Sequence, residues 1–293
     1  MNNELLLFDR LEIIKTTLKD KINDCYVSFS GGKDSVVLSA LIDLALPNNN
    51  IPRVFIDTGI EYLKIVEFVK KEQEKDKRIV IIKPTMSIKK VLATYGYPFK
   101  SKEHSCKIGQ RQKGSKAKSI VDYKDKEHFG CPKILKYQFD KDFKIKLSDK
   151  CCYKLKKEPI KKWAKENNKT ISILGLRLGE HGQRENHKGC VVFNRDGSIR
   201  VFKPMNPMSE EWEDWFIEKY KIELCDLYYP PFNFKRTGCK GCPYNVNLKE
   251  QLEKMAMFLP NEKKQCEIIR QPIYEEYKRI GYRLKNFYKR KGS

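Results

Sequence analysis

The sequence predicts an α/β fold with a doubly wound, mostly parallel sheet and a helical C-terminal tail. Short apolar runs typical of buried strands alternate with segments in which apolar residues recur every three or four positions, as in amphipathic helices. A pair of glycines also separates the first expected strand from the first helix after it. This alternation favours parallel strands with helices on both faces, and ligands in such sheets bind at the carboxyl ends of the strands.

The elements of the first third of the chain follow one another in a regular order. An amphipathic helix is expected over residues 4–22, where it should pack beside the first strand. Three strands are expected, each followed by a helix. The predicted strands are 25–29, 52–57 and 79–83, and the predicted helices are 35–45, 60–74 and 87–95.

The rest of the chain is less regular. The lysine-rich stretch 98–150 is expected to be an irregular excursion or a partly mobile lid. After it we expect a helix over 154–167, a strand over 171–174, a hairpin turned at Asp196-Gly197, and a serine-capped helix over 209–220. The last fifty residues are expected to be helical and polar, with breaks at Pro260 and Pro272.

These elements suggest four consecutive segments. They are the N-terminal part of a nucleotide-binding domain (1–97), an insertion or lid (98–150), the remainder of that domain with a cysteine-bearing region (151–245), and a basic helical C-terminal region (246–293).

Composition favours a cytoplasmic protein with no membrane contact. The chain has 293 residues, no apolar run of membrane-spanning length and no signal-peptide layout at its N-terminus. It has ten cysteines. In a cytosolic chain of this size, metal binding or catalysis is a better explanation for them than disulfides.

The net charge of +22 raises the question of a nucleic-acid partner, DNA or tRNA. Lysine-biased composition is an alternative explanation, because only 13 of the 60 basic residues are arginines. The basic residues are concentrated locally over 101–126 and 278–291. Both explanations stay open at the level of sequence.

The stretch Ser30-Gly31-Gly32-Lys33-Asp34-Ser35 joins the first strand to its helix. Glycines can take backbone angles that a side chain forbids, and a helix start directs free N–H groups and a positive dipole at an anion. The stretch therefore predicts a phosphate site. It matches neither the Walker pattern nor G-x-G-x-x-G.

Residues 30–35 resemble the pyrophosphate-binding loop of the ATP-pyrophosphatase (PP-loop) superfamily, whose members attack the α-phosphate of ATP and release pyrophosphate. Three later stretches are similar to the phosphoadenosine-phosphosulfate (PAPS) reductase branch. They are FIDTGIEY (55–62), the arginine segment GLRLGEHGQR (175–184), and the cysteine motifs CCYKLKKEPI and GCKGCPY. The resemblance spans about residues 25–245 and implies an adenine nucleotide α-hydrolase-like fold.

The resemblance also implies how the nucleotide is held. Backbone N–H groups of Gly31 and Gly32, with the hydroxyls of Ser30 and Ser35, are expected to bind the β- and γ-phosphates. Lys33 would neutralise charge on the leaving pyrophosphate, while Asp34 and Asp57 would help to place Mg²⁺. The remaining residues expected around the nucleotide are Ser28, Thr58 and Gly59.

Four cysteines form the strongest metal signal, namely Cys151-Cys152 and Cys239-x-x-Cys242. Four thiolates suit zinc or an iron–sulfur cluster, and generic spacing alone favours zinc, although adjacent cysteines fit one small ion poorly. The resemblance to adenylyl-sulfate (APS) reductases implies a [4Fe-4S] cluster instead. Leu155 stands where that motif usually has an arginine, so one hydrogen-bond donor near the cluster is expected to be missing.

Arg177 and Arg184 lie on a loop after a strand, where two guanidiniums can clamp a phosphate or sulfate. The resemblance places this segment at the anionic end of the substrate. Cys190 follows closely and is a candidate sulfur-carrying catalytic thiol. Cys106 lies in a basic stretch that should lower its pKa, but an ordinary structural role is open for both cysteines.

Other residues are assigned structural roles. We expect Cys25 and Cys225 in the core and Cys266 on a helix surface. His104 and His128 are expected to be solvated or to cap helices.

Three functions compete. The first is ATP-dependent sulfur transfer to a nucleic acid or small acceptor, as in thiolation or DNA phosphorothioation enzymes, with a sulfur-donor or electron-donor protein as a partner. The second is reduction of APS or PAPS to sulfite, and the third is a nucleotide-binding module without catalysis. Sulfonucleotide reductases usually have a degraded loop and a C-terminal cysteine motif, whereas residues 30–35 are complete and no cysteine follows Cys266. The first function is therefore favoured.

Overall fold

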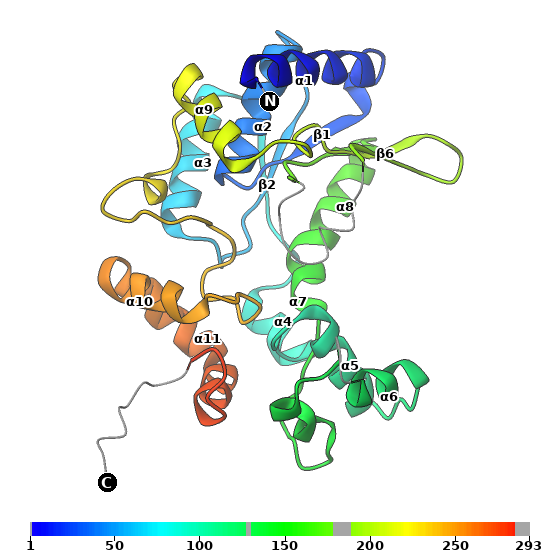
Figure 1. The fold of residues 1–293 in the computed structure, drawn as a ribbon, viewed down its shortest axis with the longest axis vertical. Helices are drawn as coiled ribbons and strands as arrows, with labels where there is room; N and C mark the ends of the chain where they lie inside the picture. Colours follow the sequence, from blue (N-terminus) through cyan, green and yellow to red (C-terminus); the bar gives the residue numbers. More distant parts are fainter. Residues whose placement is uncertain (1, 127–129, 178–188, 285–293) are drawn as a thin grey trace. The chain divides into compact units, whose positions relative to one another are not determined.

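The computed structural model describes residues 2–126, 130–177 and 189–284 (Figure 1). The chain forms two compact units built from interleaved segments. The first, here called the sheet unit, comprises Met1–Asp57, Glu61–Lys83 and Glu158–Thr237. The second, called the helical unit, comprises Thr58–Ile60, Pro84–Lys157 and Gly238–Ser293.

The sheet unit contains a six-stranded sheet in the order β3-β2-β1-β4-β6-β5. All strand pairs in it are parallel except the β5–β6 hairpin. The strands are β1 (Cys25–Ser28), β2 (Arg53–Ile56), β3 (Ile79–Ile82), β4 (Ile171–Ile173), β5 (Val191–Phe193) and β6 (Ile199–Phe202). The predicted α/β class and the mostly parallel sheet are confirmed.

Helices cover both faces of this sheet because the side chains of a strand alternate between them. Cys25 and Val27 of β1 enter a core with α1 (Asn3–Leu18), α2 (Lys33–Ala45) and α9 (Glu210–Tyr220). Tyr26, between them, packs with α8 (Glu158–Glu166) on the opposite face, and Figure 1 shows α1 and α8 on opposite sides of the strands. The helix α3 (Leu63–Lys75) follows β2. The sheet is thus doubly wound, as predicted.

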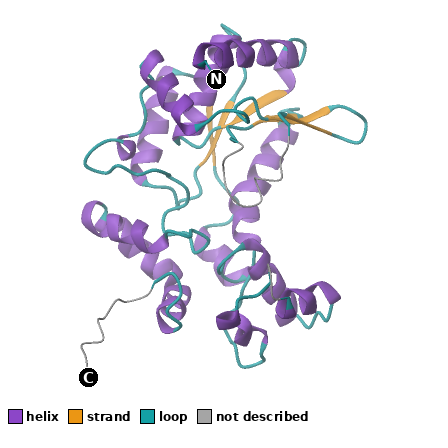
Figure 2. Cartoon of the chain, in the orientation of Figure 1, coloured by secondary structure: helices purple, strands orange, loops and turns teal. Residues whose placement is uncertain are grey.

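The helical unit contains no strand among its described residues, as the colouring of Figure 2 shows. Its helices are α4 (Ile88–Tyr95), α5 (Lys102–Gln112), α6 (Lys118–Asp125), α7 (Lys150–Cys152), α10 (Leu248–Phe258) and α11 (Pro260–Arg279). Short 3-10 turns lie at Lys133–Phe139 in this unit and at Ile22–Asp24 and Asp226–Tyr228 in the sheet unit.

The expectation of an irregular segment over 98–150 is wrong in part, because the helices α5 and α6 lie within it, and its role as an insertion or lid stays a prediction. Ser101 caps α5 by accepting a hydrogen bond from the His104 N–H at 3.1 Å, and Ile108 of α5 and Ile120 of α6 are buried. Each of these helices buries few apolar side chains among many lysines, so the 3.6-residue period is weak in the sequence. His104 is also buried rather than solvated, between Tyr123 and Gln138, and burial lowers its pKa to about 4. His128 lies outside the described residues.

The helix predicted over 154–167 begins earlier, at Lys150, and includes the Cys151-Cys152 pair. Five residues of it, Tyr153–Lys157, form a π-helical turn before α8 continues. Turns of this kind often lie at functional sites.

Both predicted proline breaks are visible near the C-terminus. Pro260 is the first residue of α11, where its missing N–H costs no hydrogen bond. Pro272 bends α11 without ending it, and Arg270 has non-helical backbone angles. This helix is amphipathic, and it buries Cys266 completely. The prediction that Cys266 lies on a helix surface is therefore wrong, whereas Cys25 and Cys225 are buried as predicted.

None of the helices in the described ranges has the length and apolarity needed to cross a membrane.

Candidate functional site

The glycine turn lies between the end of β1 and the start of α2. Gly31 has a φ of +68°, a region that favours glycine, and a Cβ atom there would lie 2.7 Å from Cγ2 of Val69 on α3. A side chain at position 31 would therefore strain the backbone and clash. Gly32 is the N-cap residue of α2, so the first N–H groups of this helix, which have no partner within the helix, face the turn. The local geometry is that of an anion site.

The two serine hydroxyls of the turn brace it from within. Ser35 Oγ accepts a hydrogen bond from the Ser30 N–H at 3.1 Å and donates one to the Gly32 carbonyl at 2.8 Å. Ser30 Oγ accepts from the Gly32 N–H at 3.3 Å. Ser35 is buried, so its hydroxyl shapes the loop. Direct phosphate contacts by these two side chains stay a prediction.

Lys33 lies among the acidic residues of the first turns of α9. Its Nζ is 3.0 Å from Asp214, 3.3 Å from Glu213 and 3.6 Å from Glu210. Burial by itself would lower the pKa of Lys33, but these carboxylates outweigh it and raise the pKa above its ordinary value. Lys33 is therefore a cation at neutral pH.

Arg177 joins the same group of charges. Its Nε donates to Asp34 at 2.9 Å, and its Nη2 lies 3.5 Å from Glu213. The structure thus brings together three predicted residues, Lys33, Asp34 and Arg177, around a fully buried glutamate. Burial, with the charge of Asp34, raises the pKa of Glu213 to about 7 despite the opposing effects of Arg177 and Lys33.

Sequence reasoning missed Glu213 as part of this site. Acidic residues in the first turn of a helix are favourable partners of the helix dipole, so Glu210, Glu211 and Glu213 have a sufficient explanation without any site. The only signal in the sequence is their number, because nothing in residues 209–220 indicates which glutamate is buried.

Tyr228 and Thr237 were missed as well. The Lys33 N–H donates to the Tyr228 hydroxyl at 3.0 Å, and that hydroxyl lies 2.6 Å from Thr237 Oγ1. These two side chains approach the first N–H groups of α2, some 200 residues away in the sequence. No local sequence pattern predicts such a contact.

The other residues predicted to contact the nucleotide are not part of the charge cluster around Lys33. Ser28 ends β1, and the Asp57 N–H donates to the Ile82 carbonyl at 2.9 Å at the end of β2. Thr58 and Gly59 belong to the helical unit, where Thr58 is buried and Gly59 has a φ of +74°. Arg184 lies outside the described residues, so the structure does not test the expected pair of arginines.

The two candidate reactive thiols lie in different units. Cys190 of the sheet unit accepts a hydrogen bond from Arg10 Nη1 at 3.4 Å and packs against the core beside α1. Its catalytic role stays a prediction. Cys106 lies on α5, and burial raises its pKa. The expectation of a lowered pKa at Cys106 is wrong because burial outweighs the nearby lysines.

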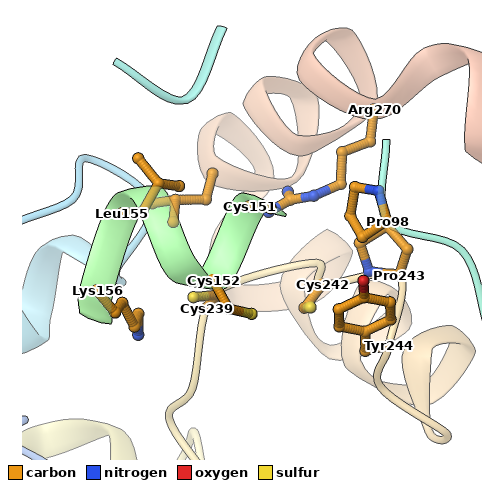
Figure 3. A pocket seen from close by; sticks show the side chains of 11 residues that line it. Pro98, Cys151, Cys152, Leu155, Lys156, Cys239, Cys242, Pro243, Tyr244 and Arg270 are labelled. Carbon is orange, nitrogen blue, oxygen red and sulfur yellow. The ribbon is translucent and has the colours of Figure 1, made fainter. Parts of the chain in front are cut away.

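All four cysteines of the predicted metal set line one pocket of the helical unit (Figure 3). Cys151 and Cys152 come from α7, and Cys239 and Cys242 come from the loop before α10. Apart from the cysteines and the two basic side chains of Lys156 and Arg270, the residues that line the pocket are mostly apolar. Its other lining residues are Ile60, Pro98, Leu155, Lys156, Pro243, Tyr244 and Arg270.

The helix α11 holds the loop that carries the second cysteine pair. Gly241 has a φ of +59°, and a Cβ there would lie 2.5 Å from the Tyr274 hydroxyl, which donates to the Gly241 carbonyl. The Tyr277 hydroxyl donates to the Pro243 carbonyl at 2.9 Å. Lys240, between the cysteines, forms a buried ion pair with Glu262 at 2.7 Å. These contacts fix the loop from a region outside the recognised motifs.

Burial raises the pKa of Cys152 and raises that of Cys242 to about 11. Within the described ranges, no three His, Cys, Asp or Glu side chains are placed to hold a single metal ion. The four thiols surround a shared space, and four thiolates are a donor set that suits either a zinc ion or an iron–sulfur cluster.

A comparison with family models matches the phosphoadenosine phosphosulfate reductase domain to residues 24–130 and 120–245. Among curated proteins, the uncharacterized protein MJ0973 of Methanocaldococcus jannaschii is 26% identical over 237 residues, which cover 78% of this chain and 44% of that protein. The chain thus spans less than half the length of this curated relative.

Solved structures with a similar arrangement share little sequence. Phosphoadenylyl-sulfate reductase from Candida auris, in a phosphate complex, is 15% identical with a TM-score of 0.46, covering 78% of this chain and 87% of that one. The U34-tRNA thiolase NcsA from Methanococcus maripaludis, with its [4Fe-4S] cluster, is 13% identical with a TM-score of 0.42, covering 92% and 80%.

Proposed function

The chain belongs to the phosphoadenosine phosphosulfate reductase domain family, and from this membership we propose that it is a PP-loop enzyme that uses ATP to drive sulfur transfer. In the proposed reaction an acceptor oxygen attacks the α-phosphate of ATP, and pyrophosphate leaves. A sulfur nucleophile then attacks the carbon or phosphorus atom that bears the adenylated oxygen, and AMP departs with that oxygen. The acceptor is a nucleic acid or a small molecule.

The observation that carries this proposal is the complete loop of residues 30–35 with two cations at its mouth. Lys33 and Arg177 both lie within 3.5 Å of Glu213, so their charges are concentrated at one place. A leaving pyrophosphate develops negative charge, and preorganised cations and N–H groups stabilise it. The loop of a reductase that binds no ATP would have no such use for its lysine.

In this proposal the carboxylates around Lys33 pair with its ammonium group only while no phosphate is bound. A bound triphosphate would compete with Asp214 and Glu213 for the Lys33 ammonium, and Asp34 with Asp57 would help to place Mg²⁺ beside it. The Tyr228 hydroxyl accepts a hydrogen bond from the Lys33 N–H. When phosphate binds, this N–H would donate to a phosphate oxygen, either instead of Tyr228 or in addition to it. The roles of Arg184 and Cys190 as substrate clamp and sulfur carrier belong to the same proposal.

We further infer that Cys151, Cys152, Cys239 and Cys242 hold a [4Fe-4S] cluster. Two features support it, the pocket that all four thiols line and the buried guanidinium of Arg270 in its wall. Clusters ligated by four thiolates are anionic, so a nearby cation suits them. When bound, such a cluster would supply a redox-active iron site. The chain's own part is to fix the ligands, which α7 and the loop braced by α11 do.

The second candidate function is reduction of APS or PAPS to sulfite, which the description of the matched family domain favours. It needs an accessible cysteine to attack the sulfur. Cys266, the last cysteine of the sequence, is fully buried, and its Sγ donates to the Lys240 carbonyl at 3.5 Å. Cys266 is therefore unsuited to that attack.

One experiment separates these functions. The anaerobically reconstituted protein is incubated with ATP, sulfide and either tRNA or DNA, and in parallel with APS or PAPS and a thiol reductant. We expect pyrophosphate and AMP in the first series and no sulfite in the second. Sulfite without pyrophosphate would replace the proposal with the reductase, and neither product with any substrate would favour a nucleotide-binding module.

A further inference from the structure

Arg270 is the one buried arginine of the described helical unit with an orphaned donor. Its side chain is 2% exposed, and in the part of the chain that the structure describes its Nη1 has no hydrogen-bond partner. It lines the same pocket as the four cysteines, and Figure 3 shows it extending from α11 toward them. The resemblance to known cysteine motifs ends before this residue.

Burying a charged donor without a partner is costly, and folded chains avoid it. The other large buried cations illustrate this. Lys240 of the same unit pairs with Glu262 at 2.7 Å, and in the sheet unit Arg53 pairs with Asp43 at 2.6 Å and donates to Ser39 at 3.0 Å. The Arg270 guanidinium hydrogen-bonds Tyr274 and Cys266, which are uncharged, and among the described residues it has no carboxylate partner. Arg270 therefore points to an anionic partner that the polypeptide itself does not provide.

The sequence places Arg270 at this point through Pro272. Proline has no N–H, and its ring clashes with the carbonyl four residues earlier, so a helix bends just before it. The bend in α11 falls at Arg270, whose φ of −117° and ψ of 18° leave the helical region. Tyr274 and Tyr277 follow on the next turns and hold the loop of Cys239 and Cys242.

We propose that Arg270 is the counter-cation of the cluster and replaces the arginine that the resembled motif carries at the position of Leu155. Leu155 is buried in the wall of the same pocket, so the two positions face the same space. This inference rests on the proposed [4Fe-4S] cluster. A buried cation that donates to the cluster sulfurs stabilises the reduced, more negative state, and so it raises the reduction potential.

The test compares three variants of the full-length chain, each reconstituted with iron and sulfide under anaerobic conditions. Arg270→Met removes the charge but fills similar space, and Arg270→Lys keeps the charge without the planar fork. Arg279→Met removes a charge from the same helix at a side chain that is 61% exposed and pairs with Glu276. The readouts are iron and sulfide content, and the midpoint potential from a redox titration followed by electron paramagnetic resonance.

We expect Arg270→Met to shift the potential clearly to more negative values, Arg270→Lys to shift it less, and Arg279→Met to leave it at the wild-type value. A wild-type potential in Arg270→Met would overturn the inference. A wild-type protein that takes up no iron would instead contradict the proposed cluster. These two failures are distinguishable because the first requires a loaded wild type.

A second measurement decides the case in which Arg270→Met holds no cluster. The iron-free, reduced proteins are unfolded thermally. If Arg270 serves an anion that the iron-free chain lacks, its removal relieves an unpaired buried charge, and the midpoint temperature of Arg270→Met should equal or exceed that of the wild type. A lower midpoint in the iron-free variant would show that Arg270 is part of the polypeptide core and would overturn the proposal.

Discussion

The glycine loop of the sheet unit (residues 30–35) and the cysteine pocket of the helical unit both contain cations shielded from solvent, but their charges are balanced differently. At the loop, Lys33 and Arg177 are each paired with carboxylates of Asp34, Glu213 or Asp214. In the pocket, Arg270 has a donor without a partner among the described residues. At the loop the groups without a hydrogen-bond partner among the described residues are the two buried oxygens of the Glu213 carboxylate, whereas in the pocket the unpaired charged group belongs to a cation.

This difference matches two kinds of ligand. A substrate must bind and leave, and carboxylates that exchange with phosphate keep the cations in place between turnovers without a large cost of desolvation. A permanently bound anionic cofactor stays in the site, so it can itself supply the negative charge that pairs with a buried cation. The proposed assignments, ATP at the loop and a cluster in the pocket, follow this distinction.

The largest expected effect is at the loop. Lys33→Ala and Asp34→Ala should each lower ATP turnover by about 10²- to 10³-fold or more, because a preorganised charge at the leaving pyrophosphate or its Mg²⁺ is lost. Pyrophosphate release measures the rate, and circular dichroism checks the fold. The matched control is Lys71→Ala, which removes an exposed lysine of α3 that pairs with Glu223. Loss of soluble protein in both loop variants would mean that the loop is structural.

The next effect concerns the pocket. Wild-type protein purified anaerobically should be brown, with iron and acid-labile sulfide, and Cys242→Ser should lose most of both because one of four ligands is gone. Cys106→Ser removes a thiol of the same unit that does not line the pocket and should keep the cluster. Stoichiometric zinc with no iron after reconstitution would contradict the assignment.

A smaller effect tests whether the loop is balanced internally. Because the pKa of Glu213 is raised from 4.5 to about 7, its contribution to stability is full below about 4.5 and is lost as the pH rises through about 7. Glu213→Gln cannot ionise. The free energy of unfolding of the wild type should therefore fall relative to this variant between pH 5 and 8, by on the order of 1 to 3 kcal/mol.

Urea unfolding at several pH values measures this difference. Glu211→Gln, an exposed position on the same helix, serves as the control and should show little pH-dependent difference from the wild type in this range. A difference between wild type and Glu213→Gln that stays constant with pH would contradict the raised pKa.

The smallest effect concerns the basic surface near α5 and α6. Lys113, Lys116 and Lys118 are exposed, and replacing all three by alanine should weaken binding to tRNA or DNA similarly across sequences. The slope of log affinity against log salt should become shallower by about one unit per lost phosphate contact. Filter binding at several salt concentrations measures it.

A matched triple change at exposed lysines of α8, Lys161, Lys162 and Lys165, removes the same charge from the other unit. Equal slopes in the wild type and both variants would leave composition as the explanation of the net charge. A small-molecule acceptor would then be the better candidate.

Much of the sheet unit was predictable, because its information is local. The strands and helices of residues 25–83 have clear apolar periods, and the glycine pair lies between two of them, so the position of the loop follows from one short stretch. Helices α5 and α6 were missed because few apolar residues mark their buried faces among many lysines. Cys266 was misplaced because a polar helix hid one buried side, which includes Ile269 and Tyr274.

The sequence by itself predicted the α/β class and singled out the glycine loop and the four cysteines, because each depends on residue types at short fixed spacing. Only the tertiary structure decided which distant charges meet there. Glu213 joins Lys33 from 180 residues away, and Arg270 joins a pocket whose recognised motifs end well before it. The physical reason is that ion pairing and desolvation depend on distances of a few ångströms in space, and chain separation carries no information about them once the fold has closed.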